Sequence, residues 1–107
     1  MIQNIVIVSG GRLGNVDFFR RKLNQTGDFL LICCDGGARH LAGTGLAPDV
    51  LIGDMDSLLL EQLELYEQQG VKVIRYPAGK DFTDTALALD YALGLEPQRI
   101  QIWGALG

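Results

Sequence analysis

The sequence is poor in long hydrophobic runs, and this scarcity excludes several classes of protein. Its apolar runs are only a few residues long, whereas a membrane-spanning helix needs about 20 consecutive apolar residues. The first residues, MIQNIVIVSGG, carry no basic segment ahead of a long apolar core, so they do not resemble a secretory signal. We therefore expect a cytoplasmic protein that does not contact a membrane.

Lysine and arginine are also few. The chain has nine of them against 13 aspartates and glutamates, for a formal net charge of -4. A nucleic-acid surface needs clustered cations that release counterions on binding, and the sequence contains no such cluster. We therefore expect no nucleic-acid partner, and a phosphate-containing ligand would need a cation to mediate its binding.

Residue types that often serve as soft metal ligands are scarce as well. The two cysteines, Cys33 and Cys34, are adjacent within the apolar run FLLICC, which favours small reduced core residues over a redox or metal role. The single histidine, His40, has no other histidine or cysteine at ligand spacing apart from these two. We expect His40 to be a surface or packing residue.

Five apolar runs do recur, with helix-like segments between them. They are NIVIVS (4–9), FLLICC (29–34), DVLIG (49–53), VKVIRY (71–76) and RIQIWG (99–104). The alternation predicts an α/β fold, a three-layer α/β/α arrangement with a mostly parallel Rossmann-like sheet, in one domain over residues 1–107. No helical segment follows the last run to cover that face, so we expect the natural protein to be longer.

The helical segments carry interpretable start and stop signals. In SLLLEQLELYEQQG, Ser57 is the predicted N-cap, Gly70 the predicted C-cap, and Leu59, Leu60, Leu63 and Tyr66 the predicted inward stripe. A second helix is predicted from about Phe82 to Leu93, with Asp81 as its cap and Gly94 as its stop. A third, between Asn15 and Gln25, should turn Phe18, Phe19 and Leu23 inward.

Acidic residues follow the third apolar run in the stretch DVLIGDMDS. Asp54 and Asp56 stand at i and i+2, so in an extended chain they point the same way with their alpha carbons roughly 6 to 7 Å apart. Like charges at that separation repel unless a cation lies between them, and Mg²⁺ prefers such oxygen ligands. A simple strand end remains the alternative interpretation of this stretch.

Other polar residues are expected at the same edge, because ligands of open parallel sheets bind outside the carboxyl ends of the strands. The predicted strand ends deliver Ser9, Gly10, Gly11 and Arg12; Asp35, Gly36 and Gly37; Asp54, Asp56 and Ser57; and Lys80, Asp81, Thr83 and Asp84.

Each of these pieces also has a purely structural interpretation as a turn or a helix cap. Taken together, carboxylates facing one edge would raise each other's pKa without a bound cation. The glycines would let backbone N–H groups approach phosphate oxygens, and Lys80 would add a positive charge. The combination suggests metal-assisted phosphoryl or diphosphoryl transfer from a nucleotide.

Two longer strings, CDGGARHLAGTGLAPDVLIGDMDS and YPAGKDFTDTALAL, together resemble the thiamine pyrophosphokinase family. The resemblance covers roughly residues 33 to 105. It implies an α/β/α catalytic domain that uses Mg²⁺ and ATP to transfer diphosphate to thiamine, with AMP as the other product. It also implies a homodimer in the full-length protein, with a further C-terminal domain and a Gly-x-Arg-x-Asp-His stretch, so that the isolated chain should turn over thiamine poorly.

Carried onto this sequence, the resemblance assigns roles to individual residues. Asp54, Asp56 and Asp81 would be the catalytic, metal-binding acids. The nucleotide and diphosphate site would be lined by Asp35, Gly36, Ser57, Lys80, Thr83 and Asp84.

The sequence also bears on several other functions. A haloacid-dehalogenase phosphatase or a receiver domain needs its acids after the first strand, where this sequence has SGGR. A pterin-type diphosphokinase of similar fold would share the metal and ATP chemistry and differ only in the acceptor. A non-catalytic nucleotide-binding fragment is the remaining alternative.

Overall fold

The computed structural model describes residues 3–41, 44–56, 58–76 and 83–105. Its elements follow the order β1 (Asn4–Val8), α1 (Val16–Gln25), β2 (Leu30–Cys34), the 3₁₀ helix η1 (Asp35–Leu41), β3 (Val50–Gly53), α2 (Leu60–Gln68), β4 (Lys72–Arg75), α3 (Asp84–Gly94) and β5 (Arg99–Trp103). Each of the five predicted strands is present, within one residue of its predicted limits at each end, which confirms the α/β fold class.

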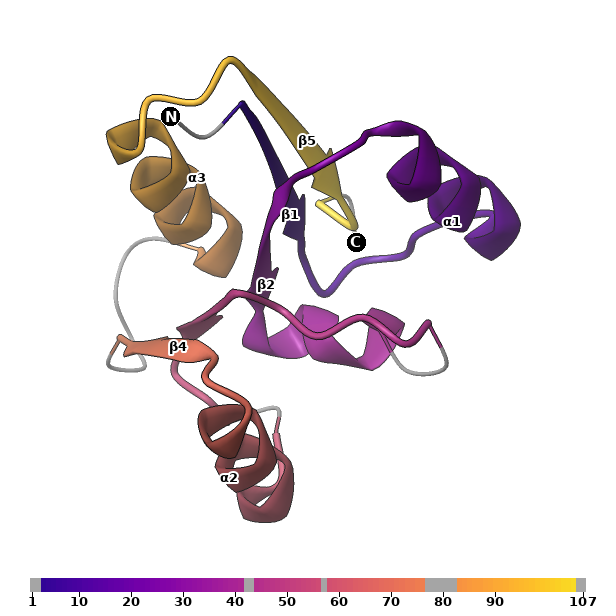
Figure 1. The fold of residues 1–107 in the computed structure, drawn as a ribbon. Helices are drawn as coiled ribbons and strands as arrows, with labels where there is room; N and C mark the ends of the chain where they lie inside the picture. Colours follow the sequence, from indigo (N-terminus) through magenta and orange to yellow (C-terminus); the bar gives the residue numbers. More distant parts are fainter. Residues whose placement is uncertain (1–2, 42–43, 57, 77–82, 106–107) are drawn as a thin grey trace.

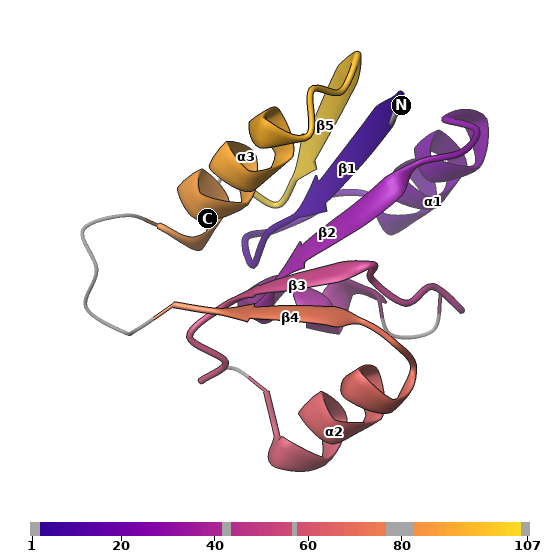
Figure 2. The ribbon, with the colours of Figure 1, turned by 60° about the vertical axis from the view of Figure 1, so that its left-hand side comes forward.

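The five strands form one parallel sheet in the order β4-β3-β2-β1-β5 (Figures 1 and 2). The central strands β1, β2 and β3 are buried almost throughout, as expected of a parallel sheet that is covered on both faces. The edge strands β4 and β5 contain only half-buried and exposed residues.

Helices lie on both faces of the sheet and make two separate hydrophobic clusters. On one face, α1, η1 and α2 pack through Phe19, Leu41 and Leu63 against strand residues that include Val8 and Leu31. On the opposite face, α3 packs through its two fully buried alanines, Ala88 and Ala92, against isoleucines of β1, β2 and β3. The small alanine side chains let α3 lie close to the sheet. This arrangement confirms the predicted three layers.

Helix ends differ from the predictions because of local capping. Helix α3 starts at Asp84, with Thr83 rather than Asp81 as its N-cap: the Thr83 hydroxyl accepts a hydrogen bond from the Ala86 N–H at 3.1 Å. It also extends through Gly94, with Leu95 as the C-cap. Helix α2 has Leu59 as its N-cap, not Ser57. Its C-cap is Gln69 and not the predicted Gly70, which follows the C-cap with a φ of 87°.

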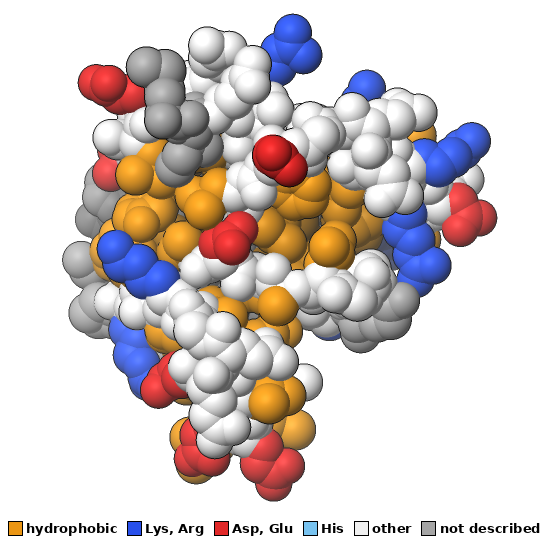
Figure 3. Space-filling model, in the orientation of Figure 1, with side chains coloured by type: hydrophobic (Ala, Val, Ile, Leu, Met, Phe, Trp, Pro, Cys, Tyr) orange, Lys and Arg blue, Asp and Glu red, His pale blue; other side chains and the backbone are white. Residues whose placement is uncertain are grey.

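Some predicted inward side chains instead face solvent. Leu59 and Leu60 are each 69% exposed because α2 begins later than expected, and only Leu63 and Tyr66 of the predicted stripe pack inward. In α1, Phe19 and Leu23 are buried as predicted, while Phe18 is 47% exposed. Figure 3 shows hydrophobic side chains on the surface of α2 at the bottom of the view.

The two cysteines are buried core residues, as predicted. Cys33 and Cys34 are free thiols buried in the centre of the sheet, one on each face. No helix in the described part of the chain is both long and apolar enough to cross a membrane.

Candidate active site at the carboxyl edge of the sheet

The ends of β2 and β3 meet at the carboxyl edge of the sheet and approach each other closely. Gly53, the last residue of β3, has a φ of 150°, and a Cβ atom there would lie 2.8 Å from Cγ of Asp35. A side chain at position 53 would therefore displace the Asp35 carboxyl. The glycine in the GDMDS motif is required by this contact.

Asp35 connects the two strand ends through backbone hydrogen bonds. Its Oδ1 accepts from the Gly36 N–H at 2.7 Å, and its Oδ2 accepts from the Met55 N–H at 2.8 Å. Met55 has a φ of 69°, in the left-handed region that a non-glycine residue rarely adopts. Asp35 is only 3% exposed. Its carboxyl group thus holds the turn that carries Asp54 and Asp56.

The acidic side chains at this edge influence one another. Burial, followed by hydrogen-bonding interactions with the side chains of Asp84 and Asp54, raises the pKa of Asp35 to about 7, against the opposing effect of the Gly36 N–H. Asp84 is the first residue of α3, on the other face of the sheet. The structure therefore brings together the acid that follows β2, the acid that follows β3 and the acid that begins α3, as expected from the sequence.

Asp54 and Asp56 lie side by side at the solvent-facing end of this group. Oδ1 of Asp54 accepts a hydrogen bond from the Asp56 N–H at 3.0 Å. That bond, followed by an interaction with the Asp35 side chain, lowers the pKa of Asp54, which is half-buried. Asp56 is exposed. Two carboxyl groups on one turn supply oxygen ligands of the type that fits a hard divalent cation.

The predicted metal-binding acids lie only partly within the described residues. Within residues 3–41, 44–56, 58–76 and 83–105, no three acidic, histidine or cysteine side chains are grouped so that they could hold a metal ion. The predicted third acid, Asp81, lies outside the described residues, as do Ser57 and Lys80. The metal set of Asp54, Asp56 and Asp81 stays a prediction.

The loop after β1 is tied to η1 by two basic side chains. Arg39 donates from Nη2 to the carbonyl oxygen of Gly10 at 2.6 Å, and Nε2 of His40 lies 2.6 Å from the carbonyl oxygen of Gly11. His40 is therefore a packing residue within the described structure, as the sequence indicated. Ser9, just before this loop, forms a side-chain hydrogen bond with Thr85 of α3.

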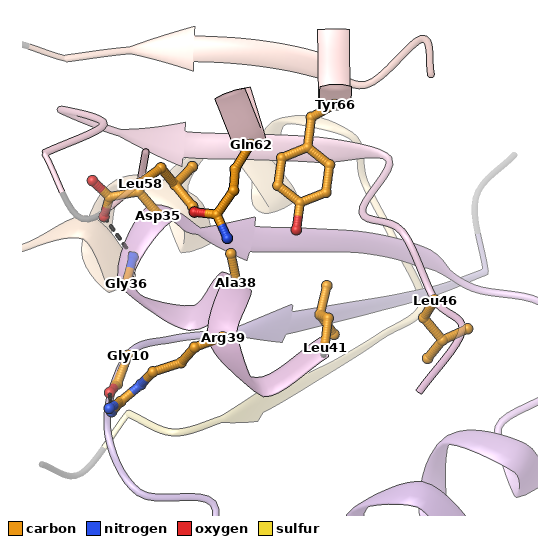
Figure 4. A pocket seen from close by; sticks show the side chains of 10 residues that line it. All are labelled: Gly10, Asp35, Gly36, Ala38, Arg39, Leu41, Leu46, Leu58, Gln62 and Tyr66. Carbon is orange, nitrogen blue, oxygen red and sulfur yellow. Dashed lines mark hydrogen bonds between the residues drawn. The ribbon is translucent and has the colours of Figure 1, made fainter. Parts of the chain in front are cut away.

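A cleft of about 580 Å³ opens beside this loop, between η1 and α2 (Figure 4). It is lined by Gly10, Asp35, Gly36, Ala38, Arg39, Leu41, Leu46, Leu58, Gln62 and Tyr66. The sequence predictions included Asp35 and Gly36 but missed Gln62 and Arg39. Gln62 and Tyr66 are four residues apart, so they share one face of α2. Because Tyr66 was predicted to face inward, this spacing is the signal that could have indicated Gln62.

Comparison with known proteins gives a consistent family assignment for these features. The family model described as "Thiamin pyrophosphokinase, catalytic domain" matches residues 21–107. A thiamine pyrophosphokinase of Bacillus subtilis is 38% identical over 78 residues, which cover 73% of this chain and 36% of that protein. Thiamine pyrophosphokinase 2 of Arabidopsis thaliana is 33% identical over 99 residues, covering 73% of this chain and 37% of that protein.

Solved structures agree with the sequence relatives. A thiamine pyrophosphokinase structure from Bacillus subtilis superimposes with a TM-score of 0.76 and 32% identity, covering 98% of this chain and 48% of that one. A thiamin pyrophosphokinase family protein from Enterococcus faecalis gives a TM-score of 0.71 and 30% identity, covering 96% of this chain and 46% of that one. The chain thus spans less than half the length of these relatives.

Proposed function

The chain belongs to the thiamin pyrophosphokinase family, and from that premise we propose that it is the nucleotide-binding catalytic part of an enzyme that transfers diphosphate from ATP to the hydroxyl of thiamine. The products are thiamine diphosphate and AMP. The observation that carries this proposal is the family match over residues 21–107, which includes every acidic motif found at the carboxyl edge.

The proposed roles of the acids follow from their positions. Asp54 and Asp56, with Asp81, would hold Mg²⁺. When bound, the ion supplies the positive charge that neutralises the phosphates of ATP, in a reaction that depends mainly on positioning and charge neutralisation. Asp35 orients the Asp54–Asp56 turn through the Met55 N–H, so its main contribution is to position the other two carboxylates.

The remaining predicted residues would bind the nucleotide and diphosphate. Gly36 lines the cleft, where a ligand oxygen would reach its main chain, and the β1 loop packs against it so closely that a Cβ on Gly10 would be 3.2 Å from the Gly36 carbonyl. Thr83 fixes the start of α3 and thereby the place of Asp84. Ser57 and Lys80 complete the proposed set. We propose a homodimer for the full-length protein.

Nucleotide titration followed by product analysis tests this function. The chain should bind ATP in the presence of Mg²⁺ and lose most of that binding when EDTA removes the ion. In the full-length protein, AMP release from ATP should then depend on thiamine, whereas the isolated chain should turn over thiamine poorly. Release with a pterin alcohol in place of thiamine would identify a pterin-type diphosphokinase instead. Mg-ATP binding with no AMP release for either acceptor would favour a non-catalytic nucleotide-binding fragment.

A further inference from the structure

Helix α3 packs on the sheet mainly through small side chains. Its two fully buried residues are Ala88 and Ala92, while larger side chains such as Leu87 and Tyr91 are only partly buried. Each alanine offers one methyl group, so it makes few of the interdigitating contacts that fix one element against another. The helix runs antiparallel to the strands, and its first turn therefore lies at the carboxyl edge (Figure 2). A directional contact at that turn would fix it more firmly than alanine packing does.

The hydroxyl groups of Ser9 and Thr85 supply such a contact. They form a side-chain hydrogen bond between the residue that follows β1 and the second residue of α3. Ser9 is only 7% exposed, and Thr85 is half-buried. Cys34, at the end of β2, adjoins the pair: burial raises the pKa of its thiol, and hydrogen bonding with Ser9 and Thr85 opposes that rise. The bond thus lies in the interior, between two strand ends and the helix.

Ser9 is itself held in place by the backbone around it. Its N–H donates to the carbonyl oxygen of Trp103, the last residue of β5, at 2.7 Å. Two glycines also approach its carbonyl oxygen closely: a Cβ atom would lie 2.5 Å from it on Gly104 and 2.9 Å from it on Gly37. Because the end of β5 and η1 both close on Ser9, its hydroxyl is a fixed anchor. The partner that the bond positions is therefore Thr85.

The first turn of α3 carries an acid of the candidate site. Asp84 directly precedes Thr85, and its carboxyl group interacts with that of Asp35. Asp35 in turn orients the acidic turn after β3 by accepting from the Met55 N–H at 2.8 Å. A shift of the first turn of α3 along the sheet would move Asp84 away from both groups. The bond between Ser9 and Thr85 opposes that shift.

We propose that Ser9 and Thr85 are positioning residues for this site: their hydrogen bond holds the first turn of α3 so that Asp84 stays beside the acids that follow β2 and β3. Neither hydroxyl needs to touch a substrate for this role. The inference rests on the proposed Mg-ATP site and adds the contact that keeps its acids together.

Amide hydrogen exchange, measured by NMR without any ligand, tests the contact directly. Thr85→Val removes the hydroxyl and keeps the shape of the side chain, whereas Thr85→Ser keeps the hydroxyl. The amides of Ala86 and Leu87 donate to the side chain and carbonyl of Thr83 at 3.1 and 3.0 Å. With one hydrogen bond lost, this turn should open more often, so both amides should exchange about tenfold faster in Thr85→Val and within about twofold of wild type in Thr85→Ser.

Calorimetric titration with Mg-ATP gives the second measurement. Thr85→Val and Ser9→Ala should each weaken binding about tenfold, and the double variant should bind no more weakly than either, because both changes remove the same bond. Thr85→Ser should bind as wild type does. Thr26→Val is the matched control: its hydroxyl also bonds a side chain, Gln101 at 2.8 Å, but it precedes β2 at the opposite edge of the sheet. Its Mg-ATP affinity should not change.

Unchanged exchange of the two amides in Thr85→Val would overturn the proposal, as would a failure of Thr85→Ser to keep ATP affinity. Equal losses of affinity in Thr85→Val and Thr26→Val would also overturn it, since the effect would then be one of general stability. If the amides respond as expected but the wild-type chain binds no Mg-ATP, the result counts against the proposed function alone.

Discussion

At the scale of single residues, Asp54 and Asp56 distinguish a metal site from a strand end. Asp54→Asn and Asp56→Asn should each remove most Mg-dependent ATP binding, because an amide is a poor replacement for an anionic oxygen ligand. Their melting temperatures should be unchanged or slightly raised, since a like-charge repulsion is relieved and an amide oxygen at position 54 can still accept from the Asp56 N–H.

The alternative interpretation, in which Asp56 caps the following helix, predicts a cost of about 1 kcal/mol for Asp56→Ala. Helix α2 has Leu59 as its N-cap, so we expect less than about 0.5 kcal/mol for that change. Asp90→Asn, on the exposed surface of α3, is the control for removing one negative charge. Full Mg-ATP affinity in Asp54→Asn would end the metal-site hypothesis.

The two buried cysteines should make the protein sensitive to alkaline pH. Burial raises the pKa of Cys34 to about 12 and that of Cys33 even further above its usual range. In the unfolded chain a thiol titrates near pH 8.5. Between about pH 8.5 and 12 the unfolded state therefore binds fewer protons than the folded state, so the free energy of unfolding falls as pH rises, by up to about 1.4 kcal/mol per pH unit for each thiol.

Urea unfolding at pH 7.5 and pH 10 under reducing conditions measures this fall. The double variant Cys33→Ala/Cys34→Ala should start from a lower stability, because it leaves small cavities, but should lose less on going to pH 10. An equal loss in both proteins would assign the alkaline effect to other groups.

At the scale of elements, η1 can form only because Gly37, which has no side chain, lies directly against the backbone at the end of β1. A Cβ on Gly37 would lie 2.4 Å from the Val8 carbonyl oxygen and 2.9 Å from that of Ser9. Gly37→Ala should therefore lower the free energy of unfolding by about 3 kcal/mol or more. Gly94→Ala, in α3 with no atom within 4 Å of the added Cβ, should raise it by about 0.5 to 1 kcal/mol. Chemical denaturation of both variants makes the comparison, and a tolerated Gly37→Ala would show that η1 can shift.

The strands were predictable and the helix ends were not, for physical reasons that particular residues illustrate. Runs such as NIVIVS form buried strands because both faces of the sheet are covered, and this leaves a continuous apolar signal. Where a helix starts depends on which of several neighbouring polar residues serves as its N-cap. In KDFTDT the hydroxyl of Thr83 caps α3, whereas the pattern also allowed Asp81. Leu59 and Leu60 continue an apolar pattern beyond the point where α2 begins, and periodicity cannot show that boundary.

The candidate site was partly predictable for a related reason. Asp35, Asp54 and Asp84 were expected together because parallel strands end at one edge. The hydrogen bonds that orient them depend on the φ values of Gly53 and Met55, which no residue pattern specified. The cleft depends on how far α2 stands from η1, so Gln62 and Arg39 had no role until the two elements were placed.

At the scale of the whole molecule, the edge strand β5 leaves an incompletely covered surface. Helix α3 contacts β1, β2 and β3, and Ile102 of β5 and Leu93 of α3 are 40% and 58% exposed. We expect the chain to associate as its concentration rises. Ile102→Lys should reduce this association, while Leu65→Lys, on exposed α2, should leave it unchanged. Light scattering over a concentration series measures the effect, and a monomer at high concentration would contradict it.

The pairing of β1 with β5 also has a consequence for synthesis on the ribosome. Asn4 of β1 pairs with Arg99 of β5, so one edge of β1, the first strand to be synthesised, has no hydrogen-bonding partner until β5, the last strand, has been synthesised. β2 is available early, but at about 5 to 20 residues per second the segment from Cys34 to Arg99 takes several seconds to emerge. During that interval the nascent chain presents an open strand edge of high apolar content, which is the type of surface that chaperones bind.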